Sequence, residues 1–497
     1  MPRLLGLALL VVASIPVLSG CGSKNPPSND TVPRTIPKKR ERVQPAPIDL
    51  AALPFKYKDH NVVFVSFDAL QAAHTGLLGY ERDVTPTLDV FAQDCFIFEN
   101  QISVASWTVP SSMSWFTGVY PSEHRLTNKF AVYSDSVQKP ARLTELAPSL
   151  ITLAQILKDN GYATGGFTGN AGVSGPFGFA QGFDVYFAEK EKFGSLERSI
   201  PEALDWVKAN RDKKFFLFLH GYDCHGQSAP AGGYDYRFVD KAYDRKFTGS
   251  VQEQEVLREE GLDKGQLTLR DQDVRFWRAI YDEKIQRADA KFKSFLAQFA
   301  ETGLTEKTLF IITSDHGTEF YEHRRLDHGF TLYQEQIHVP LLIKLPGQKG
   351  GRLVTERHSS LDLMPTILDL LDVDVPNAAQ KQMRGTSLVA ALTHEAASQD
   401  IISETDYRQY TYKRSLIAPD GWKLIYTLES RSRELYDLNT DPAEQHDLAS
   451  TQSKKADELE DRLFTHFRAI GHDLTTHSWE PGLNPVYNSQ AKGKPKE

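Results

Sequence analysis

The sequence predicts an α/β fold with a mostly parallel central sheet, helices on both of its faces, and a small antiparallel subdomain at the C-terminal end. The sheet is predicted by continuous apolar runs of strand length, which recur along the chain with helix-like segments between them. The subdomain is predicted by the runs KRSLIAPDGWKLIYTL and RELYDL, which follow residue 375 and contain Pro419-Asp420-Gly421 as a turn. A chain of 497 residues is long enough for one large domain with such an appendage.

The N-terminal end is not expected to belong to the folded core. Arg3 precedes an apolar run from Leu4 to Leu18, which is too short for a membrane-spanning helix and is typical of an export signal over residues 1–20. Residues 21–60 are rich in proline, serine, lysine and arginine, so we expect them to form a tether.

The rest of the chain divides into three parts. A large α/β domain is expected over residues 61–375, a subdomain with a closing helix over 376–470, and a frayed tail over 471–497. One helix of the large domain is clearly marked, with Ser149 as its cap and Asn160-Gly161 as its stop. Buried strands of the large domain are expected at 62–67, 163–169, 215–219, 309–314 and 340–345.

Charge and cysteine content exclude two classes of protein. The formal net charge is −8 and the chain has no basic block, so the electrostatic footprint of a nucleic-acid-binding protein is missing. The three cysteines, Cys21, Cys95 and Cys224, are too few for a disulfide framework. The sequence leaves open whether Cys95 and Cys224 pair.

Aspartate and histidine residues gather directly after the predicted strands. In an open α/β sheet, ligands bind beyond the carboxyl ends of the strands, so these positions are the first place to look for a site. One such residue alone is more often a helix cap or a turn residue, but three strand ends of this kind together predict a site for a divalent cation. The residues are Asp68 after the first run, His220, Asp223 and His225 after the third, and Asp315 and His316 after the fourth, with His323 and His328 a short loop beyond.

The stretch SVASWTVPSSMSWFTG is rich in hydroxyl side chains. Pro110 suits the first position of a helix and Gly118 suits its end, which places Thr108 just before a helix N-terminus. Free N–H groups and the helix dipole favour an anion there, so a hydroxyl held against a metal would become a competent nucleophile. The alternative is that Thr108, Ser111 and their neighbours only cap this helix.

Taken together, these motifs resemble those of the sulfatase family within the alkaline phosphatase superfamily. The resemblance covers residues 61–465, and it implies an alkaline-phosphatase-like three-layer α/β/α sandwich that hydrolyses a sulfuric or phosphoric ester. The segments that carry it are FVSFDALQAAHTGLLGY, TVPSSMSWFTGVYPSEH, FFLFLHGYDCH, TSDHGTEF, DHGFTLYQEQIHVPLLIKLPG and ELYDLNTDPAEQHDLA.

The resemblance also implies roles for individual residues. Asp68, Asp315 and His316 would bind a divalent cation. His225 would contact the transferred group or protonate the leaving oxygen, and His328 would contact the metal or the substrate anion.

Four other residues near these motifs are given lesser roles by the resemblance. Asp223 would serve only a second metal ion, if the site were binuclear. His220, His323 and Glu319 are expected to be loop residues.

The nucleophile position departs from the family pattern. Sulfatases carry a cysteine or serine there, which is oxidised to formylglycine and supported by an arginine, whereas this chain has Thr108 and, in place of the arginine, Ser112. The Lys-x-His of many sulfatases is also missing from residues 167–170. Because threonine is no substrate for that oxidation, the chain is more similar to threonine-nucleophile relatives such as phosphodiesterases, phosphonate hydrolases and phosphoglycerol or phosphoethanolamine transferases. Thr108 is therefore expected to be the nucleophile and to contact the metal.

The metal ligands depart from the family pattern as well. The usual pair of aspartates is reduced to Asp68, which is followed by Ala69. Fewer carboxylates and more histidines favour zinc or manganese, although calcium stays possible.

The N-terminus carries a resemblance of its own. Leu18-Ser19-Gly20-Cys21 is similar to the lipobox of bacterial lipoproteins, which implies that Cys21 is acylated and becomes the new N-terminus. Gly22 then favours the outer membrane of a Gram-negative cell. The alternative is a plain signal peptide followed by an incidental cysteine.

The leading hypothesis is therefore a metal-dependent hydrolase of an anionic ester, held at the cell envelope by a lipid anchor. A second hypothesis is transfer of a phosphoryl-linked group onto an envelope glycan or lipid, although such transferases usually carry several membrane helices and this sequence has no such run after residue 20. A third is a surface lipoprotein that binds a ligand without catalysis. No obligate protein partner can be read from the sequence.

Overall fold

The structure is a computed structural model that describes residues 40–127, 132–134, 137–141, 146–190, 193–394, 399–407 and 411–475. These residues belong to one compact unit, residues 39–497. The expected export signal, Cys21 and most of the expected tail lie outside the described residues. In the described part of the chain, no helix combines the length and the apolar character that crossing a membrane requires.

The large domain is built, within the described residues, on an eight-stranded sheet in the order β12-β2-β11-β8-β1-β7-β5-β6. All neighbouring pairs are parallel except those of β11, which is antiparallel to both β8 and β2. The sheet is thus mostly parallel, as predicted. The expected runs do not include the short strand β6, nor β2 and β12, which carry polar residues within the strand. The strands are β1 (Asn61–Phe67), β2 (Phe96–Ile102), β5 (Ala163–Thr168), β6 (Val185–Ala188), β7 (Phe215–Gly221), β8 (Thr308–Thr313), β11 (His338–Lys344) and β12 (Arg352–Ser359).

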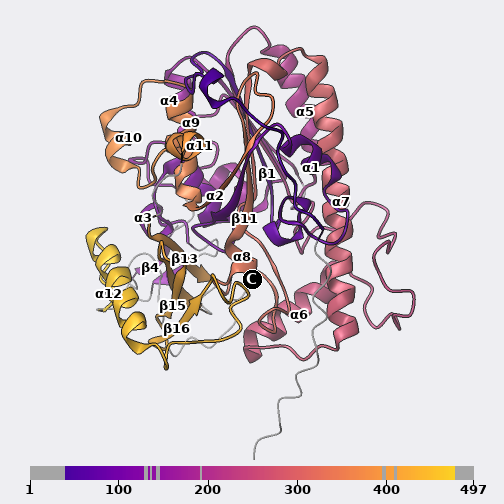
Figure 1. Ribbon diagram of the computed structural model, residues 1–497, viewed down its shortest axis with the longest axis vertical. Helices are drawn as coiled ribbons and strands as arrows, with labels where there is room; N and C mark the ends of the chain where they lie inside the picture. Colours follow the sequence, from indigo (N-terminus) through magenta and orange to yellow (C-terminus); the bar gives the residue numbers. More distant parts are fainter. Residues whose placement is uncertain are drawn as a thin grey trace, which may run out of the picture. The chain divides into compact units, whose positions relative to one another are not determined.

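Helices cover both faces of this sheet, which gives three layers (Figure 1). Side chains alternate along β1, so that Val62 and Phe64 pack into one core cluster and Val63 and Val65 into the other. This arrangement confirms the predicted α/β/α sandwich. The first cluster includes residues of α2 (Thr108–Thr117), α4 (Leu153–Asp159), α9 (Leu363–Leu370), α10 (Asn377–Gln382) and α11 (Val389–Thr393), and the second includes residues of α1 (Pro86–Ala92), α5 (Leu196–Ala209) and α7 (Asp271–Glu301).

Helix α4 begins later than predicted. Its N-cap is Thr152 and not Ser149, because the Thr152 hydroxyl accepts a hydrogen bond from Gln155 N while the Gln155 side chain accepts one from Thr152 N. The helix ends at Asp159 with Asn160 as its C-cap, so the predicted stop is confirmed.

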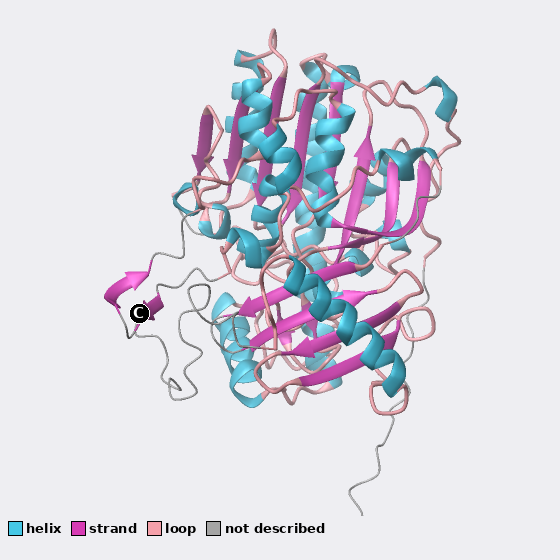
Figure 2. Ribbon diagram, turned by 90° about the vertical axis from the view of Figure 1, so that its left-hand side faces the viewer, coloured by secondary structure: helices cyan, strands magenta, loops and turns pink. Residues whose placement is uncertain are grey.

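The C-terminal subdomain is, as far as it is described, a four-stranded antiparallel sheet with helix α12 across it (Figure 2). Two or three strands were expected; the additional one is β13, which the sequence motifs do not mark. The predicted closing helix is confirmed as α12, whose Leu459, Leu463 and Phe467 are buried against the sheet. The elements are β13 (Ile401–Tyr407), β14 (Thr411–Ile417), β15 (Trp422–Thr427), β16 (Ser432–Asp437) and α12 (Ser453–Ala469).

Residues 40–60, the described part of the expected tether, lie against the large domain. Ala46 N donates a hydrogen bond to the Gln93 carbonyl oxygen at 3.0 Å, and Tyr57 N donates one to the Leu370 carbonyl oxygen at 2.6 Å. The Tyr57 side chain is buried. The folded unit therefore begins before residue 61, where the change in composition indicates its boundary.

Shorter elements connect these parts, and the two described cysteines do not pair. Cys95 and Cys224 are both buried as free thiols. The remaining described elements are α3 (Pro121–His124), α6 (Val251–Lys264), α8 (Gln334–Ile337), β3 (Val132–Ser134), β4 (Val137–Ala141), β9 (Glu319–Phe320), β10 (Leu326–Asp327) and short 3-10 helices such as Leu50–Ala52.

Candidate active site

Three neighbouring parallel strands bring candidate metal ligands to one edge of the sheet. β1 lies between β7 and β8, and Ser66 of β1 is in register with His220 of β7 and Thr313 of β8. Asp68 follows β1 directly, and Asp315 is the second residue after β8. Donor atoms of Asp68, His220 and Asp315 all lie within 4.8 Å of one another. The topology therefore places residues that are far apart in the chain around one point.

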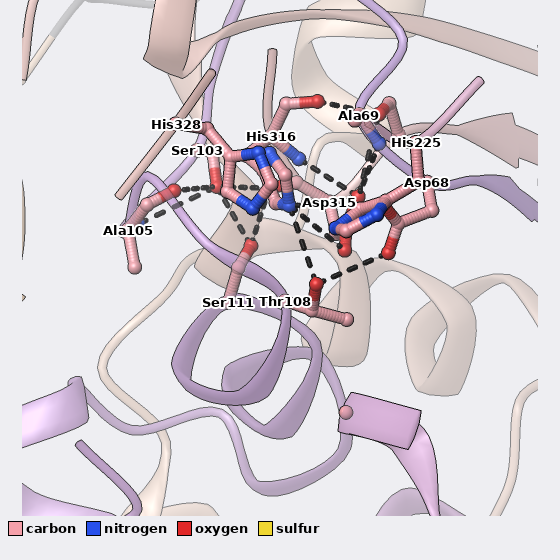
Figure 3. Close-up of polar contacts among 12 residues, drawn as sticks. Asp68, Ala69, Ser103, Ala105, Thr108, Ser111, His225, Asp315, His316 and His328 are labelled. Carbon is pink, nitrogen blue, oxygen red and sulfur yellow. Dashed lines mark hydrogen bonds and ion pairs between the residues drawn. The ribbon is translucent and has the colours of Figure 1, made fainter. Parts of the chain in front are cut away.

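His316 adds a fourth donor to this group. Its Nε2 lies 3.6 Å from Asp315 Oδ2 and 3.9 Å from Asp68 Oδ1 (Figure 3). Its Nδ1 lies 2.7 Å from the Gly317 carbonyl oxygen, to which it can only donate, so the neutral ring keeps its lone pair on Nε2. That atom faces the carboxylates. We call Asp68, His220, Asp315 and His316 the donor cluster; all four side chains are fully buried.

The donor cluster fits a divalent cation. Asp68 Oδ1, Asp315 Oδ2 and both ring nitrogens of His220 are buried and have no hydrogen-bond partner among the described residues. Buried polar groups are nearly always satisfied, and a bound ion would satisfy these. Carboxylates combined with imidazoles are ligands that suit zinc or manganese better than calcium.

Ionisation of the cluster also favours a bound cation. Burial, reinforced by the Asp315 carboxylate, raises the pKa of Asp68 well above its ordinary value. Burial lowers the pKa of His220 to about 4, so its ring is neutral near pH 7 and able to act as a ligand. A positive ion would relieve the repulsion between the two buried carboxylates.

Thr108 lies beside the donor cluster at the start of α2. Trp107 is the N-cap and Thr108 the first helical residue, so Pro110 is the third residue of the helix and not the first, as the sequence suggests. The Thr108 hydroxyl donates to Asp68 Oδ2 at 3.1 Å and lies 3.3 Å from His316 Nε2. The hydroxyls of Thr108 and Ser111 bond Asp68 and the Asp315 carbonyl oxygen, and the N-cap Trp107 makes no side-chain hydrogen bond, so these hydroxyls do more than cap the helix. Gly118 ends the helix as predicted, with φ of 68°.

Two serine hydroxyls tie α2 to the loop after β8. Ser103 and Ser111 each donate to the Asp315 carbonyl oxygen at 2.5 Å, and their hydroxyls lie 2.7 Å apart. Both hydroxyls are thus used to hold the helix that carries Thr108 against the segment that carries Asp315.

A buried histidine fixes the first turn of α2 and makes stability depend on pH. His124 Nε2 lies 3.1 Å from the Pro110 carbonyl oxygen, while Leu126 N donates to His124 Nδ1. Burial lowers the pKa of His124 to about 3. Because the unfolded chain has the higher pKa, near 6.5, it binds more protons, and stability is lost as the pH falls below that value.

The variant His124→Gln should remove this part of the pH dependence, since glutamine can still donate to the Pro110 carbonyl. Urea unfolding of both proteins measures it. The free energy of unfolding of the natural protein, relative to that of the variant, should fall by about 2 kcal/mol between pH 7 and pH 5. The slope is about 1.4 kcal/mol per pH unit below the pKa of the unfolded chain. An advantage that stays constant over this range would contradict a neutral, buried His124.

His225 presents a proton to the site. Its Nδ1 accepts a hydrogen bond from Gln227 N at 3.2 Å, so the neutral ring carries its proton on Nε2. Nε2 lies 3.7 Å from Asp68 Oδ1. The ring is stacked on Phe193, with centroids 4.9 Å apart and planes inclined by 16°. A fixed N–H in this position can donate a hydrogen bond to an anion bound in the site.

His328 also belongs to the site. Its ring centroid lies 4.2 Å from that of His316 and 4.9 Å from that of His225. Its Nδ1 is 2.5 Å from Asp327 Oδ1, which leaves Nε2 for contacts in the site. Although burial opposes it, the neighbouring His328 and Arg258 hold the pKa of Asp327 well below its ordinary value, so this partner is charged near neutral pH.

Asp223, considered from the sequence for a second metal ion, is not brought into the donor cluster. Ser195 Oγ and Leu196 N donate to its two carboxylate oxygens at 2.8 Å each, and Lys291 Nζ lies 2.6 Å from Oδ1. Asp223 therefore anchors the start of α5 and pairs with α7.

Two residues expected to lie in loops lie in strands. His220 is the last residue but one of β7 and joins the donor cluster, so its place among the candidate residues after the third run was right and the loop position given to it from the resemblance is wrong. The signal that favours a ligand over a loop residue here is a histidine inside an otherwise apolar, fully buried strand. Glu319 begins β9 and is buried, whereas His323 lies in a loop as expected and pairs with Glu335 at 2.7 Å.

The three-layer fold, with a buried donor cluster beside a helix-borne hydroxyl, is the architecture of alkaline phosphatase superfamily hydrolases. Comparison with known proteins narrows this class. Residues 60–373 match the family described as sulfatase, and residues 321–470 match the one described as N-sulphoglucosamine sulphohydrolase, C-terminal. The chain belongs to the sulfatase family, whose members are metal-dependent ester hydrolases.

Individual relatives agree with this assignment. Arylsulfatase K of Mus musculus is 24% identical over 468 residues, which cover 84% of this chain and 78% of the relative. A protein solved in complex with its substrate D-glucosamine-2-N,6-O-disulfate has a TM-score of 0.64 at 18% identity, covering 84% of this chain and 100% of the other. The phosphonate monoester hydrolase of Agrobacterium radiobacter has a TM-score of 0.62 at 18% identity, covering 84% and 97%. At these identities the two structures show a common fold.

Proposed function

We propose that this protein hydrolyses sulfate or phosphate esters with Thr108 as its nucleophile and with zinc or manganese in the donor cluster. The observation that supports this most directly is the position of Thr108 Oγ1, 3.1 Å from Asp68 and 3.3 Å from His316. Three serine hydroxyls beside the cluster are bonded to backbone carbonyl oxygens instead, those of Ser103 and Ser111 to Asp315 and that of Ser314 to His316. A bound divalent cation would supply Lewis-acid stabilisation of the negative charge that develops on the ester oxygens.

Asp68 and His225 assist the reaction of Thr108 in different ways. Thr108 Oγ1 forms a bond to sulfur or phosphorus as its proton passes to Asp68 Oδ2, the oxygen that already accepts its hydrogen bond. The bond from sulfur or phosphorus to the leaving oxygen breaks, His225 Nε2–H donates a hydrogen bond to that oxygen as it becomes negative, and the oxygen takes its proton from solvent. Water then attacks the threonine ester and releases a proton to solvent, while the bond from sulfur or phosphorus to Thr108 Oγ1 breaks and this oxygen takes back its proton from Asp68 Oδ2.

Among esters, a sulfated carbohydrate is the leading candidate substrate. The relatives named for sulfate ester chemistry, and the similar protein solved with a sulfated glucosamine, support it. A phosphonate or phosphate ester is the second candidate, which the similarity to phosphonate monoester hydrolase supports. Both are tetrahedral anions that the same site can accept.

The proposed location is the bacterial cell envelope, with a lipid on Cys21 as the anchor. The support is the lipobox-like sequence before Cys21. Mass spectrometry of the mature N-terminus, with Cys21→Ser as the unmodified control, checks it.

A substrate panel tests the proposed activity. The purified protein, reconstituted with zinc or with manganese, is assayed on p-nitrophenyl sulfate, p-nitrophenyl phosphate, bis(p-nitrophenyl) phosphate and p-nitrophenyl phenylphosphonate. We expect turnover of at least one ester, loss of it with a chelator, and about one equivalent of tightly bound metal. Absence of both turnover and bound metal would support the alternative of a binding protein without catalysis.

A further inference from the structure

The loop that carries His328 is held by the C-terminal sheet. Residues 319–336, here called the His328 loop, run from β9 into α8. Thr405 of β13 donates to the Gly329 carbonyl oxygen at 2.5 Å. Gly329 lies so close to Tyr407 that a Cβ at this position would come within 2.4 Å of the Tyr407 ring. The residue that follows His328 is therefore packed directly on the first strand of that sheet.

The centre of this contact is an ion pair without access to solvent. Lys423 Nζ lies 2.6 Å from Glu444 Oε1, and both side chains are 0% exposed. Each partner also bonds the backbone of the His328 loop: Lys423 Nζ donates to the Leu332 carbonyl oxygen at 2.5 Å, and Gln334 N donates to Glu444 Oε2 at 2.6 Å.

His323 adds a second link between the same segments. Although burial opposes it, the hydrogen bond with Glu335 raises the pKa of His323 to about 9, so the ring is charged at neutral pH. Its Nδ1 pairs with Glu335 at 2.7 Å and its Nε2 donates to the Glu444 carbonyl oxygen at 2.8 Å. Glu444 therefore binds the His328 loop through both its backbone carbonyl oxygen and its side chain.

The sheet is itself fixed against the segment that leads to Thr108. Glu404 N donates to the Val104 carbonyl oxygen at 2.7 Å, and the Ser403 hydroxyl donates to the Ser103 carbonyl oxygen at 2.7 Å. β13 thus contacts both the approach to the nucleophile and the His328 loop. A shift of the loop on this sheet would change the position of His328 relative to Thr108.

The cost of removing two charges from water offsets much of the attraction within a buried ion pair, so such a pair adds little to stability. It can still favour one arrangement of the segments that it joins over others. We propose that the Lys423–Glu444 pair positions the His328 loop, so that the C-terminal sheet contributes to catalysis through His328 without contacting the substrate. This inference rests on the proposed function of the protein, with His328 in the role that the resemblance implies, contact with the metal or the substrate anion. Lys423 and Glu444 are positioning residues.

The variant Glu444→Gln tests the proposal in the full-length, metal-loaded protein. We expect kcat on the best p-nitrophenyl ester to fall roughly 10-fold with metal content unchanged, because loop coupling of this kind is modest. Hydrogen exchange of residues 326–332 should become faster while that of β1 and β7 stays the same. Two controls are matched to it: Asp420→Asn, which breaks an exposed ion pair with Lys455 of the same subdomain, and Leu463→Ala, which destabilises that subdomain without contacting the loop. Both should keep kcat within about 2-fold.

A double-mutant cycle shows whether Glu444 acts through His328. In the His328→Ala background, Glu444→Gln should lower kcat by less than about 2-fold, because the residue it positions is gone. A full 10-fold loss in that background would overturn the proposal. If His328→Ala alone leaves kcat unchanged, the proposed function of His328 is wrong, and hydrogen exchange still decides the positioning: faster exchange at 326–332 supports it and unchanged exchange overturns it.

Discussion

Replacing Thr108 with alanine should lower kcat/KM for the best ester substrate by at least about 10⁴-fold, since removal of a catalytic nucleophile can cost about 10⁶-fold. No substitute is at hand, because the Ser103 and Ser111 hydroxyls are bonded to the Asp315 carbonyl. Binding of the metal should change little, since the four donors of the cluster stay. The measurement is steady-state kinetics together with metal content of the purified variant.

The variant Thr108→Ser is the matched control. It keeps the hydroxyl but loses the methyl group, which lies close to Gly172, where an added Cβ would come within 3.1 Å of Thr108 Cγ2. A serine hydroxyl rotates more freely there, so we expect a loss of only about 10-fold. With a slow substrate, mass spectrometry should find a sulfo or phospho group on the Thr108 peptide and none in the alanine variant. Full activity of Thr108→Ala would contradict the assignment of Thr108 as the nucleophile.

The fold and part of the site could be predicted because both depend on local patterns. Apolar runs mark β1, β7 and β8, and the carboxyl ends of parallel strands meet at one edge, so Asp68, Asp315 and His316 were expected together. Nothing in the runs indicates that β11 is antiparallel, because a buried strand is apolar in either direction.

Two neighbouring residues show where sequence reasoning about the site ends. His220 and Asp223 follow the same apolar run, yet the structure brings only His220 into the donor cluster. Asp223 is turned away because Lys291, 68 positions later in the chain, pairs with it. Such long-range contacts decide whether His220 or Asp223 faces the site, and the local sequence does not contain them.

The variant Asp68→Asn should be more stable than the natural protein when both are free of metal, and it should no longer respond to metal. Asp68 is fully buried beside Asp315, and its Oδ1 has no hydrogen-bond partner among the described residues. Because its pKa is raised on folding, the carboxyl of Asp68 lowers the stability of the metal-free protein above its ordinary pKa, by about 1.4 kcal/mol for each pKa unit of the shift, and a neutral asparagine of the same shape avoids this loss. In the natural protein a cation at 1,000 times its Kd would add about 4 kcal/mol, which for a chain of this length raises Tm by about 4 °C.

Asp223→Asn is the control that separates a metal ligand from an ordinary buried carboxylate. Asp223 also follows β7 at the edge of the sheet, but it bonds Ser195, Leu196 and Lys291, so its loss should lower Tm with and without metal. Asp68→Asn should do the reverse: Tm of the metal-free protein rises, the increase on adding zinc or manganese disappears, and metal affinity falls at least about 100-fold. Thermal unfolding with and without chelator measures all three proteins. If Asp68→Asn kept the metal-dependent rise in Tm, the cation would have to bind elsewhere, since a site that loses one of its two carboxylates cannot retain its affinity.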